Sequence, residues 1–517
     1  MNYSMQKNKM YVTWLVAFTA ILSAQVESAK ILGIFWTFGR SHYLTGSTLL
    51  KALAASGHEV HVLSTFEDDA NIPNFKHELL TGILCPDILN NNASVIAQIT
   101  EILPMLTNNI EKFWENEAVK RLIDTKPKYD AVISLSFFND FVLALPHYLE
   151  APTIIYSAMS SNVINNKYVA NPNLPYGENM AANAPLNTFF GRLSAASMNM
   201  FMSVMEKYIL GTMQNIINRR YLPSAPPVQE LTENISLVLV NSHFAIESPK
   251  PYVPNMIQIG GFHSQKNKKL PEDLQKYLDS AKDGAVLFSM GSVVKVGENI
   301  PKEQLDIIMT GLGKLAPIKV LFKSEVKIPT APKNVLISNW LPQNDILAHP
   351  NLKVFISHGG LGSTTEAVAH GVPMLGIPFF ADQKSNIASV VKTGFAIGLE
   401  HDKMTQESFD SAIRELLTNS TYTAIAKKRS SLLTKQRVKP LENAIWWVEH
   451  IIEHKGGEHL RNVGMDLEWY QLYMVDIMLF FLVLISTILI ISFFITRWTL
   501  RRLINVFARG PKKVKEN

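Results

Sequence analysis

Short apolar runs that alternate with helical patterns constrain the fold of this chain most. Ile31–Trp36 is followed by a helical pattern from Leu44 to Ser56, and after Gly57 a second apolar run begins at Val60–Leu63. A strand, a helix and a second strand of this length predict two parallel strands joined by a right-handed crossover. Further buried strands are predicted at Ala131–Ile133, Thr153–Tyr156 and Leu237–Val240.

A polar, lysine-rich stretch from His263 to Leu270 interrupts this pattern, and a second set of apolar runs follows it. We therefore predict an α/β protein of two Rossmann-like, doubly wound domains: an N-terminal domain at 29–262, a linker at 263–282 and a C-terminal domain at 283–472. Ligands of such sheets bind at the carboxyl ends of the strands. A helix is predicted at Lys302–Leu315, and the strands of the second set at Ala285–Phe288, Lys319–Phe322, Val335–Ile337, Val354–Ile356 and Met374–Ile377.

The two ends of the chain carry targeting and membrane signals. Lys7 and Lys9 precede the apolar run Met10–Leu22, and small residues follow, which indicates a signal peptide at 1–28 that is cleaved after Ser28. The run is too short for a membrane anchor. Ile477–Thr496 contains no charged residue and is long enough to cross a bilayer, so we predict a transmembrane helix at 473–498 and a basic cytoplasmic tail at 499–517.

The charge distribution predicts a lumenal protein that does not bind nucleic acid. The net charge of the whole chain is +5, and the basic tail accounts for it, so the remainder is close to neutral. Positive charge stays on the cytoplasmic side, which places both domains in the lumen. Lys513 and Lys515 resemble a dilysine signal for return to the endoplasmic reticulum. The sequons at Asn92, Asn234 and Asn419 are candidate glycosylation sites. A single cysteine excludes an intrachain disulfide.

Polar residues at the ends of the second set of strands predict a nucleotide site. His358 follows a buried strand, and the next two glycines open a helix, where backbone N–H groups and the Ser363 and Thr364 hydroxyls suit a phosphate. Glu366, one helical turn beyond Ser363, could accept hydrogen bonds from ribose hydroxyls. A glycine pair after a strand is by itself more often only a helix start.

Residues before and after this helix extend the site. Trp340 offers a flat surface on which a base could stack, and Gln343 lies beside it as an amide. Asp382 and Gln383, an acid and an amide side by side, suit the hydroxyls of a sugar. Base, phosphate, ribose and sugar in this order favour a nucleotide sugar as the ligand.

The combined pattern resembles the signature of the UDP-glycosyltransferases. Similarity extends over nearly the whole chain, including Phe288–Ser292, Val240–Phe244 and the two ends, which are those of the animal, endoplasmic-reticulum branch. The residues that stand at the family's spacing are Trp340, Gln343, His358, Gly359, Gly360, Ser363, Glu366, Gly371, Pro373, Pro378, Asp382 and Gln383.

The resemblance implies the GT-B fold and inverting transfer from a UDP-sugar to a small lipophilic acceptor, a reaction used in detoxification. The C-terminal domain would hold the donor and the N-terminal domain the acceptor. Trp340 would stack on uracil beside Gln343. Ser292, His358, Gly360 and Ser363 would hold the diphosphate. Glu366 would hold the ribose, and Asp382 with Gln383 the sugar.

The resemblance also implies a reaction without a metal or another cofactor, the UDP-sugar being a co-substrate. The sequence agrees, since it has neither an Asp-x-Asp motif near a strand end nor a Cys/His cluster. Glucose is the predicted sugar, because Phe379–Gln383 resembles insect members, and glucuronic acid is the alternative. Lys250 stands where many relatives have arginine, so a phosphate contact there is uncertain.

Catalysis needs a base for the acceptor hydroxyl, and His42, in the loop after the first strand, matches the family's catalytic histidine. Many relatives orient that histidine with an acid at the position of Leu135, and leucine cannot do so. The nearest acid is Asp140, at the start of the next helix, and we predict that it takes the role. A helix-capping duty is the alternative for Asp140.

The sequence also bears on two other classes of protein. A dinucleotide oxidoreductase is excluded, because no Gly-x-Gly-x-x-Gly follows the first strand, where Gly33 and Gly39 are the only glycines. A non-catalytic member that binds UDP-sugars or lipophiles remains open. The acceptor is not predicted by any single residue of the N-terminal half, and the sequence leaves a homo-oligomer open.

Overall fold

The computed structural model describes residues 28–508 except 69–70, 84–94, 175–185, 265–267, 293 and 380–381. Nearly all of the predicted signal peptide, the Asn92 sequon and the lysines at 513 and 515 lie outside these residues. The chain forms two compact units, Met1–Arg461 and Asn462–Asn517, which are described separately.

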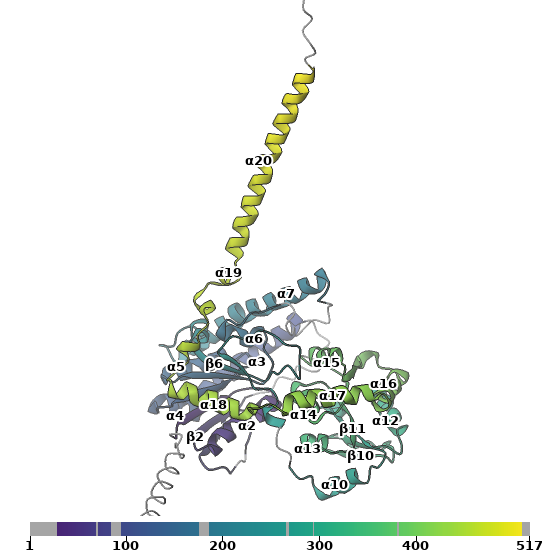
Figure 1. The fold of residues 1–517 in the computed structure, drawn as a ribbon. Coiled ribbons are helices and arrows are strands. Elements are labelled where there is room, and N and C mark those ends of the chain that lie inside the picture. Colours follow the sequence, from purple (N-terminus) through teal and green to yellow (C-terminus); the bar gives the residue numbers. More distant parts are fainter. Residues whose placement is uncertain are drawn as a thin grey trace, which may run out of the picture. The chain divides into compact units, whose positions relative to one another are not determined.

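The first sheet has seven strands, and every neighbouring pair is parallel (Figure 1), in the order β3-β2-β1-β4-β5-β6-β7. The central strands are almost wholly buried, since helices cover both faces of the sheet. The five strands predicted in this half are confirmed. Its strands are β1 (Lys30–Phe35), β2 (Glu59–Ser64), β3 (Phe75–Leu79), β4 (Ala131–Leu135), β5 (Thr153–Ser157), β6 (Ile235–Val240) and β7 (Met256–Gln258).

The second sheet has six strands, again all parallel, in the order β10-β9-β8-β11-β12-β13. The five strands predicted in this half are also confirmed. Two parallel sheets of Rossmann type therefore make up the first unit. The strands are β8 (Ala285–Ser289), β9 (Lys319–Lys323), β10 (Val335–Ser338), β11 (Leu352–Ser357), β12 (Met374–Gly376) and β13 (Ala396–Gly398).

Helices connect successive strands and cover the sheets. Those of the first half are α2 (Arg40–Ala55), α3 (Val95–Glu115), α4 (Glu117–Thr125), α5 (Ala144–Tyr148), α6 (Val163–Asn166), α7 (Phe189–Val204), α8 (Gly211–Tyr221) and α9 (Val228–Leu231). Those of the second half are α10 (Glu272–Asp279), α11 (Val296–Asn299), α12 (Lys302–Gly313), α13 (Gln343–Leu347), α14 (Leu361–His370), α15 (Gln383–Lys392), α16 (Gln406–Thr418), α17 (Ser420–Thr434) and α18 (Pro440–Glu453).

Helix α18 returns to the first sheet. Its apolar face, Ala444, Val448 and Ile451, is fully buried in the same hydrophobic cluster as β1 and α2. His58, between α2 and β2, lies 3.2 Å from Glu449 of α18, measured from Nε2 to Oε1. The predicted boundaries assign this helix to the C-terminal domain by its place in the sequence, whereas its packing joins it to the N-terminal sheet.

The second unit contains one long apolar helix. After the short helix α19 (Trp469–Leu472), helix α20 runs from Val475 to Ala508. Its segment Val475–Asn505 is long and apolar enough to cross a membrane, with none of that segment buried. This helix coincides with the membrane span predicted from the sequence and extends beyond it into the basic tail.

Candidate active site

His358 lies at the carboxyl edge of the second sheet, in the short connection between β11 and α14. Its side chain is buried, and two glycines make room for it. A Cβ added at Gly291 would lie 2.6 Å from Cε1 of His358, and one added at Gly360 would lie 2.6 Å from Nε2. Gly291 also has a φ of +72°, which favours glycine. The loop after β8 and the start of α14 therefore meet around this ring.

A cation that the sequence had not indicated, Lys323, lies near His358. Lys323, the last residue of β9, donates from Nζ to the carbonyl of Gly291 at 2.6 Å. Burial first, and then the charge of Lys323, lowers the pKa of His358 to about 4, so this imidazole is neutral at pH 7. Arg40, at the start of α2, also acts on Lys323 and helps to lower its pKa, although burial is the larger cause. The carboxylate of Glu325 acts on the pKa of Lys323 in the opposite direction.

Three residues predicted for different parts of the donor, Gln343 for the base, Ser363 for the diphosphate and Glu366 for the ribose, are in contact with one another. Nε2 of Gln343 donates to Oγ of Ser363 at 3.0 Å and to Oε2 of Glu366 at 2.6 Å. Burial raises the pKa of Glu366 to about 7, although the Gln343 hydrogen bond acts in the opposite direction. Trp340 is 64% exposed, so a face of its indole is free to stack on a base. Ser292 is also exposed at the end of the loop after β8.

Asp382 and Gln383 lie at the N-terminus of α15. Asn386, one turn into the helix, donates from Nδ2 to Asp382 at 2.8 Å and to the carbonyl of Gly359 at 3.0 Å. Gln383 accepts from the backbone N–H of Phe379 at 2.9 Å. Asn386 therefore connects the predicted sugar residues to the glycines beside His358, a link that the sequence pattern did not single out.

His42 lies in the first turn of α2, at the carboxyl edge of the first sheet. Its ring meets the Phe137 ring edge-on, with centroids 5.0 Å apart. Among the described residues, Nδ1 of His42 is buried without a hydrogen-bond partner. Burial lowers its pKa, and the Asp382 carboxylate acts in the opposite direction. His42 is therefore neutral at pH 7 and lies near the residue predicted to hold the sugar.

Asp140 begins the 3-10 helix η2 (Asp140–Leu143), as predicted, but the structure does not bring it to His42. Its carboxylate accepts from Tyr168 at 2.6 Å and forms an ion pair with Lys167, which also contacts Glu206 at 2.6 Å. The His42–Asp140 pair is absent among the described contacts. Leu135 is fully buried in the core, in agreement with its having no catalytic role.

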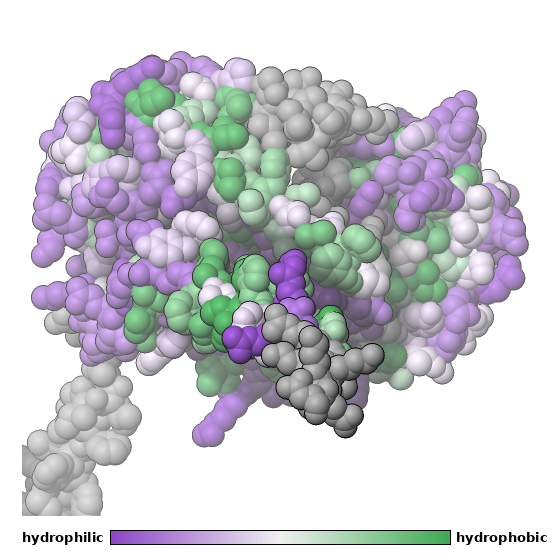
Figure 2. All heavy atoms as spheres, turned by 90° about the horizontal axis from the view of Figure 1, so that it is seen from above, coloured by the Kyte–Doolittle hydropathy of each residue, from purple (hydrophilic) through white to green (hydrophobic). Residues whose placement is uncertain are grey.

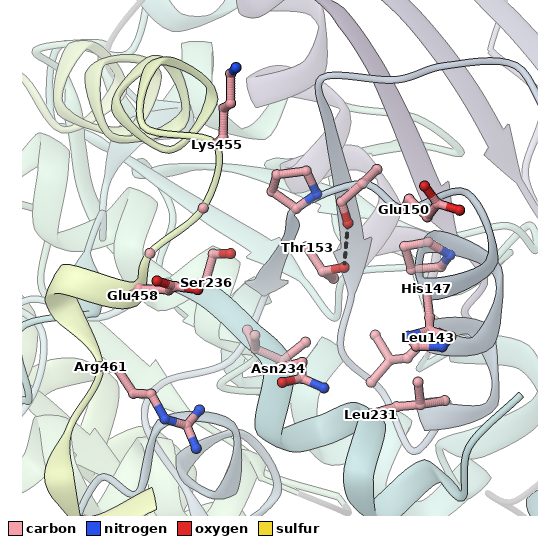
Figure 3. Close-up of a pocket in the computed structure, with 16 residues that line it drawn as sticks. Leu143, His147, Glu150, Thr153, Leu231, Asn234, Ser236, Lys455, Glu458 and Arg461 are labelled. Carbon is pink, nitrogen blue, oxygen red and sulfur yellow. Dashed lines mark hydrogen bonds between the residues drawn. The ribbon is translucent and has the colours of Figure 1, made fainter.

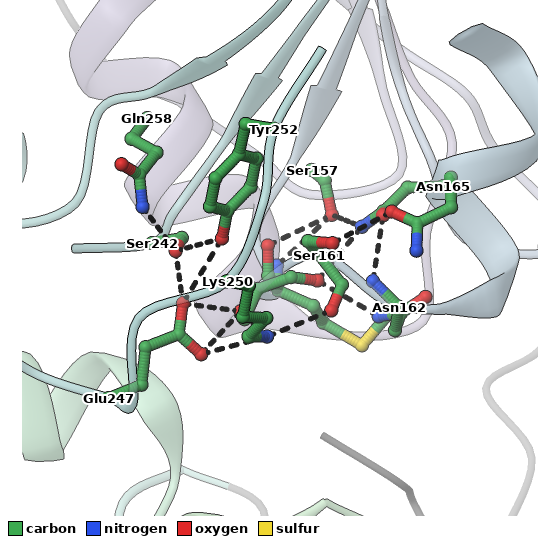
Figure 4. A network of polar contacts seen from close by, with 12 residues as sticks. Ser157, Ser161, Asn162, Asn165, Ser242, Glu247, Lys250, Tyr252 and Gln258 are labelled. Atoms are coloured by element: carbon green, nitrogen blue, oxygen red, sulfur yellow. Dashed lines mark hydrogen bonds and ion pairs between the residues drawn. The ribbon is translucent and has the colours of Figure 1, made fainter. Parts of the chain in front are cut away.

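Lys250 belongs to a buried polar network within the first half of the chain (Figure 4). Its Nζ lies 3.0 Å from Glu247 and donates to Oγ of Ser160 at 2.8 Å and to the carbonyl of Ser161 at 3.0 Å. Tyr252 and Ser242 complete the network around Glu247. In this arrangement Lys250 holds protein groups together, whereas Lys323 is the cation that acts on His358.

A separate cavity of about 690 Å³ lies away from these residues (Figure 3). Thr153 and Ser236, near the starts of β5 and β6, line it on one side. The other side is lined by Lys455, Gly456, Gly457, Glu458 and Arg461. Because it adjoins the amino ends of these strands, it is on the opposite edge of the first sheet from His42. Its lining includes Asn234, an exposed sequon residue; Asn419, the other sequon asparagine in the described chain, is half-buried and caps α17.

Within the described ranges, no group of three or more His, Cys, Asp or Glu side chains is arranged to hold a metal ion.

Comparison with protein families gives a match over most of the chain. The family model described as "UDP-glucoronosyl and UDP-glucosyl transferase" matches residues 68–510. UDP-glucosyltransferase 2 of Dactylopius coccus is 31% identical, over 97% of this chain and 99% of that protein. UDP-glucuronosyltransferase 2C1 of Oryctolagus cuniculus is 29% identical, over 87% of this chain and 95% of that protein.

Solved structures support the fold. The spinosyn forosaminyltransferase SpnP superposes with a TM-score of 0.57 at 15% sequence identity, covering 82% of this chain and 99% of that one. At this identity the likeness concerns the fold alone, and it agrees with the GT-B arrangement of two Rossmann-like sheets.

Proposed function

Because the chain belongs to the UDP-glucuronosyl and UDP-glucosyl transferase family, we propose that it transfers glucose from UDP-glucose to a hydroxyl of a small lipophilic acceptor, with inversion and with His42 as the base. The observation that carries the proposal is His42, which lies against Phe137 with its Nδ1 buried and without a partner among the described residues, and close enough to Asp382 for that carboxylate to act on its pKa. The insect relative's name supports glucose.

The donor is held by the second sheet in this proposal. Uracil stacks on Trp340, whose indole is exposed, and the ribose hydroxyls bind Glu366, which Gln343 holds in place. The diphosphate lies at the N-terminus of α14, where backbone N–H groups, the neutral His358 ring and the Lys323 cation surround it. Donors fixed in this way stabilise the negative charge that develops on the leaving UDP.

The chemical step involves one bond formed and one broken. The acceptor oxygen attacks the anomeric carbon from the face opposite the phosphate, and its proton passes to His42. The bond from the anomeric carbon to the phosphate oxygen breaks, and its electron pair leaves with UDP. Attack from the opposite face inverts the configuration. His42 can accept the proton because burial lowers its pKa and keeps it neutral.

Asp140 remains the candidate for the carboxylate that stabilises the His42 imidazolium. Its present contacts show what would have to change for it to do so. To reach His42 its side chain would have to release Lys167 or Tyr168. Phe137, in the loop that precedes Asp140, already contacts the His42 ring. A rearrangement of this loop could therefore bring the Asp140 carboxylate towards His42.

We place both domains in the lumen of the endoplasmic reticulum, with α20 as the single membrane anchor. The basic residues after the apolar segment support this orientation, and the animal relatives support a membrane enzyme.

A donor panel tests the proposal. Membranes that contain the full chain are incubated with a phenol and with UDP-glucose, UDP-galactose, UDP-N-acetylglucosamine or UDP-glucuronate, and released UDP is measured. UDP-glucose should give the fastest release. Release from UDP-glucuronate alone would make the chain a glucuronosyltransferase, the alternative that the rabbit relative favours. Binding of UDP-sugars without any release would identify a non-catalytic member.

A further inference from the structure

Helix α7 presents an apolar face to solvent, and this face has no use in the proposed reaction. Six large apolar side chains of the helix are between 37% and 77% exposed. We call them the apolar stripe: Phe189, Phe190, Leu193, Met200, Phe201 and Val204. In Figure 1, α7 lies at the surface of the first half of the chain. Figure 2 shows hydrophobic side chains interspersed among hydrophilic ones on the molecule seen from above.

The stripe runs along one side of the helix. Phe189, Leu193, Met200 and Val204 are separated by four, seven and four residues, which places them on one helical face. The face is about 24 Å long. The buried residues of α7 are Gly191 and Ala195, so the helix packs on the protein through its smallest side chains. An ordinary amphipathic surface helix has the reverse arrangement, with its large apolar residues inside.

The exposed charges of the same helical segment are all basic. Between Phe189 and Tyr221 the basic residues are Arg192, Lys207, Arg219 and Arg220, all exposed. Glu206 is the segment's one acidic residue in the sequence, and it is buried against Lys167. A partner that is apolar and bears negative charge at its surface would complement this segment.

A bilayer with anionic headgroups has this chemistry and is within reach of the chain. Residues 462–474 join the first unit to the membrane-spanning segment that begins at Val475, so the first unit cannot be farther than about 45 Å from the end of that segment. An apolar stripe with basic residues beside it is typical of a helix that lies in the membrane interface, buried by about 5–10 Å.

We propose that α7 lies in the interface of the membrane that α20 spans and that it holds the first unit against the lipid surface. Its apolar stripe contacts acyl chains, and its basic residues contact the headgroups. This second contact does not depend on the proposed transfer reaction. It would also place the N-terminal domain where lipophilic molecules are concentrated.

The test uses the full chain in nanodiscs that contain an anionic lipid, with Cys85→Ser as the background. Met200→Cys carries an environment-sensitive fluorophore on the stripe, and Glu303→Cys, on the exposed face of α12, is the matched control. Lipids with a doxyl quencher near the headgroup, or near the end of the acyl chain, report the depth of the label.

The label at residue 200 should lose about half of its fluorescence with the shallow quencher and less with the deep one, as an interfacial helix requires. The control label should not be quenched by either. Equal, negligible quenching at both positions would overturn the proposal. Self-quenching between labels of two copies at residue 200, without lipid quenching, would also overturn it and would assign the stripe to a dimer contact. Phe190→Ser with Val204→Ser should reduce the lipid quenching at residue 200.

Discussion

At the scale of single residues, the sequence identifies the candidate site residues, and the structure shows which residues surround them. Gln343, Ser363 and Glu366 were each identified from the sequence, but their mutual contact was not, because β10 and β11, which precede them, are three places apart in the sheet. Lys323 was not predicted, although a signal was present: it ends the apolar run of β9 at the same edge. The neighbour of His42 could not be predicted, since an aromatic contact with Phe137 depends on how two loops meet.

The pKa of His42 gives a prediction for the pH dependence of kcat. Burial lowers that pKa below 6.5, so the base form is present at pH 7 and is lost only as the pH falls through the lowered value. With saturating UDP-glucose, kcat should stay level down to about pH 6.5 and fall below it. Saturation matters because the pKa of Glu366 is about 7, so donor binding has its own pH dependence. A fall in kcat that begins above pH 7 would contradict a buried histidine base.

Asp140 is tested by a pair of variants that both break its buried ion pair. Asp140→Asn removes the carboxylate, and Lys167→Met removes the cation that holds it. If Asp140 stabilises the His42 imidazolium, Asp140→Asn should lower kcat about tenfold or more, while Lys167→Met should keep most of the turnover. Thermal unfolding is the control, since both variants lose the same pair. Equal kcat in the two variants, with lower melting temperatures, would leave Asp140 with a structural role alone.

At the scale of secondary structure, the buried strands were predictable, and of the four edge strands only β10 was predicted. The central strands are continuous apolar runs because helices cover both of their faces. The strands that the sequence missed, β3, β7 and β13, lie at the edges of the sheets and are only five or three residues long. In β3, Phe75–Leu79, no residue is fully buried, so its sequence lacks the apolar signal. The packing of α18 on the first sheet is likewise a tertiary contact, which a local sequence pattern does not predict.

The junction of β11 and α14 offers a matched pair of glycine substitutions. A Cβ at Gly360 would meet the His358 ring at 2.6 Å, whereas one at Gly362, two residues on in the same segment, has open space around it. Overpacking of this kind costs roughly 1–3 kcal/mol, so Gly360→Ala should weaken UDP binding about tenfold. Gly362→Ala should bind UDP like the parent chain. Calorimetric titration with UDP measures both, and equal affinities would show that the His358 ring does not contact the diphosphate.

At the scale of the whole molecule, the sequence predicted the two Rossmann-like sheets and the helix that, among the described residues, is long and apolar enough to span a membrane, because each depends on long apolar patterns. The placement of His42 near Asp382 needed the folded chain, since it depends on how the two sheets face each other. The predicted domain boundaries follow the order of the sequence. Helix α18 comes after the second sheet in the sequence but packs on the first sheet, so sequence order alone does not predict which sheet a helix covers.

The basic tail makes a prediction about location. Lys513→Ser with Lys515→Ser should allow the protein to leave the endoplasmic reticulum, which would be seen as glycans that become resistant to endoglycosidase H. Arg501→Ser with Arg502→Ser, in the described end of α20, is the control for a general loss of positive charge. An unchanged location in the lysine variant would show that those lysines serve only the orientation of the membrane helix.

The central claim is that His42 serves as the base for an inverting transfer from UDP-glucose. The most direct measurement follows the product by NMR, with UDP-glucose and a phenol as substrates, for the parent chain and for His42→Ala. The parent chain should form the β-glucoside from the α-linked donor, and His42→Ala should be slower by about a hundredfold or more while its affinity for UDP is unchanged. An α-glucoside, or a His42→Ala variant with parental turnover, would contradict the account.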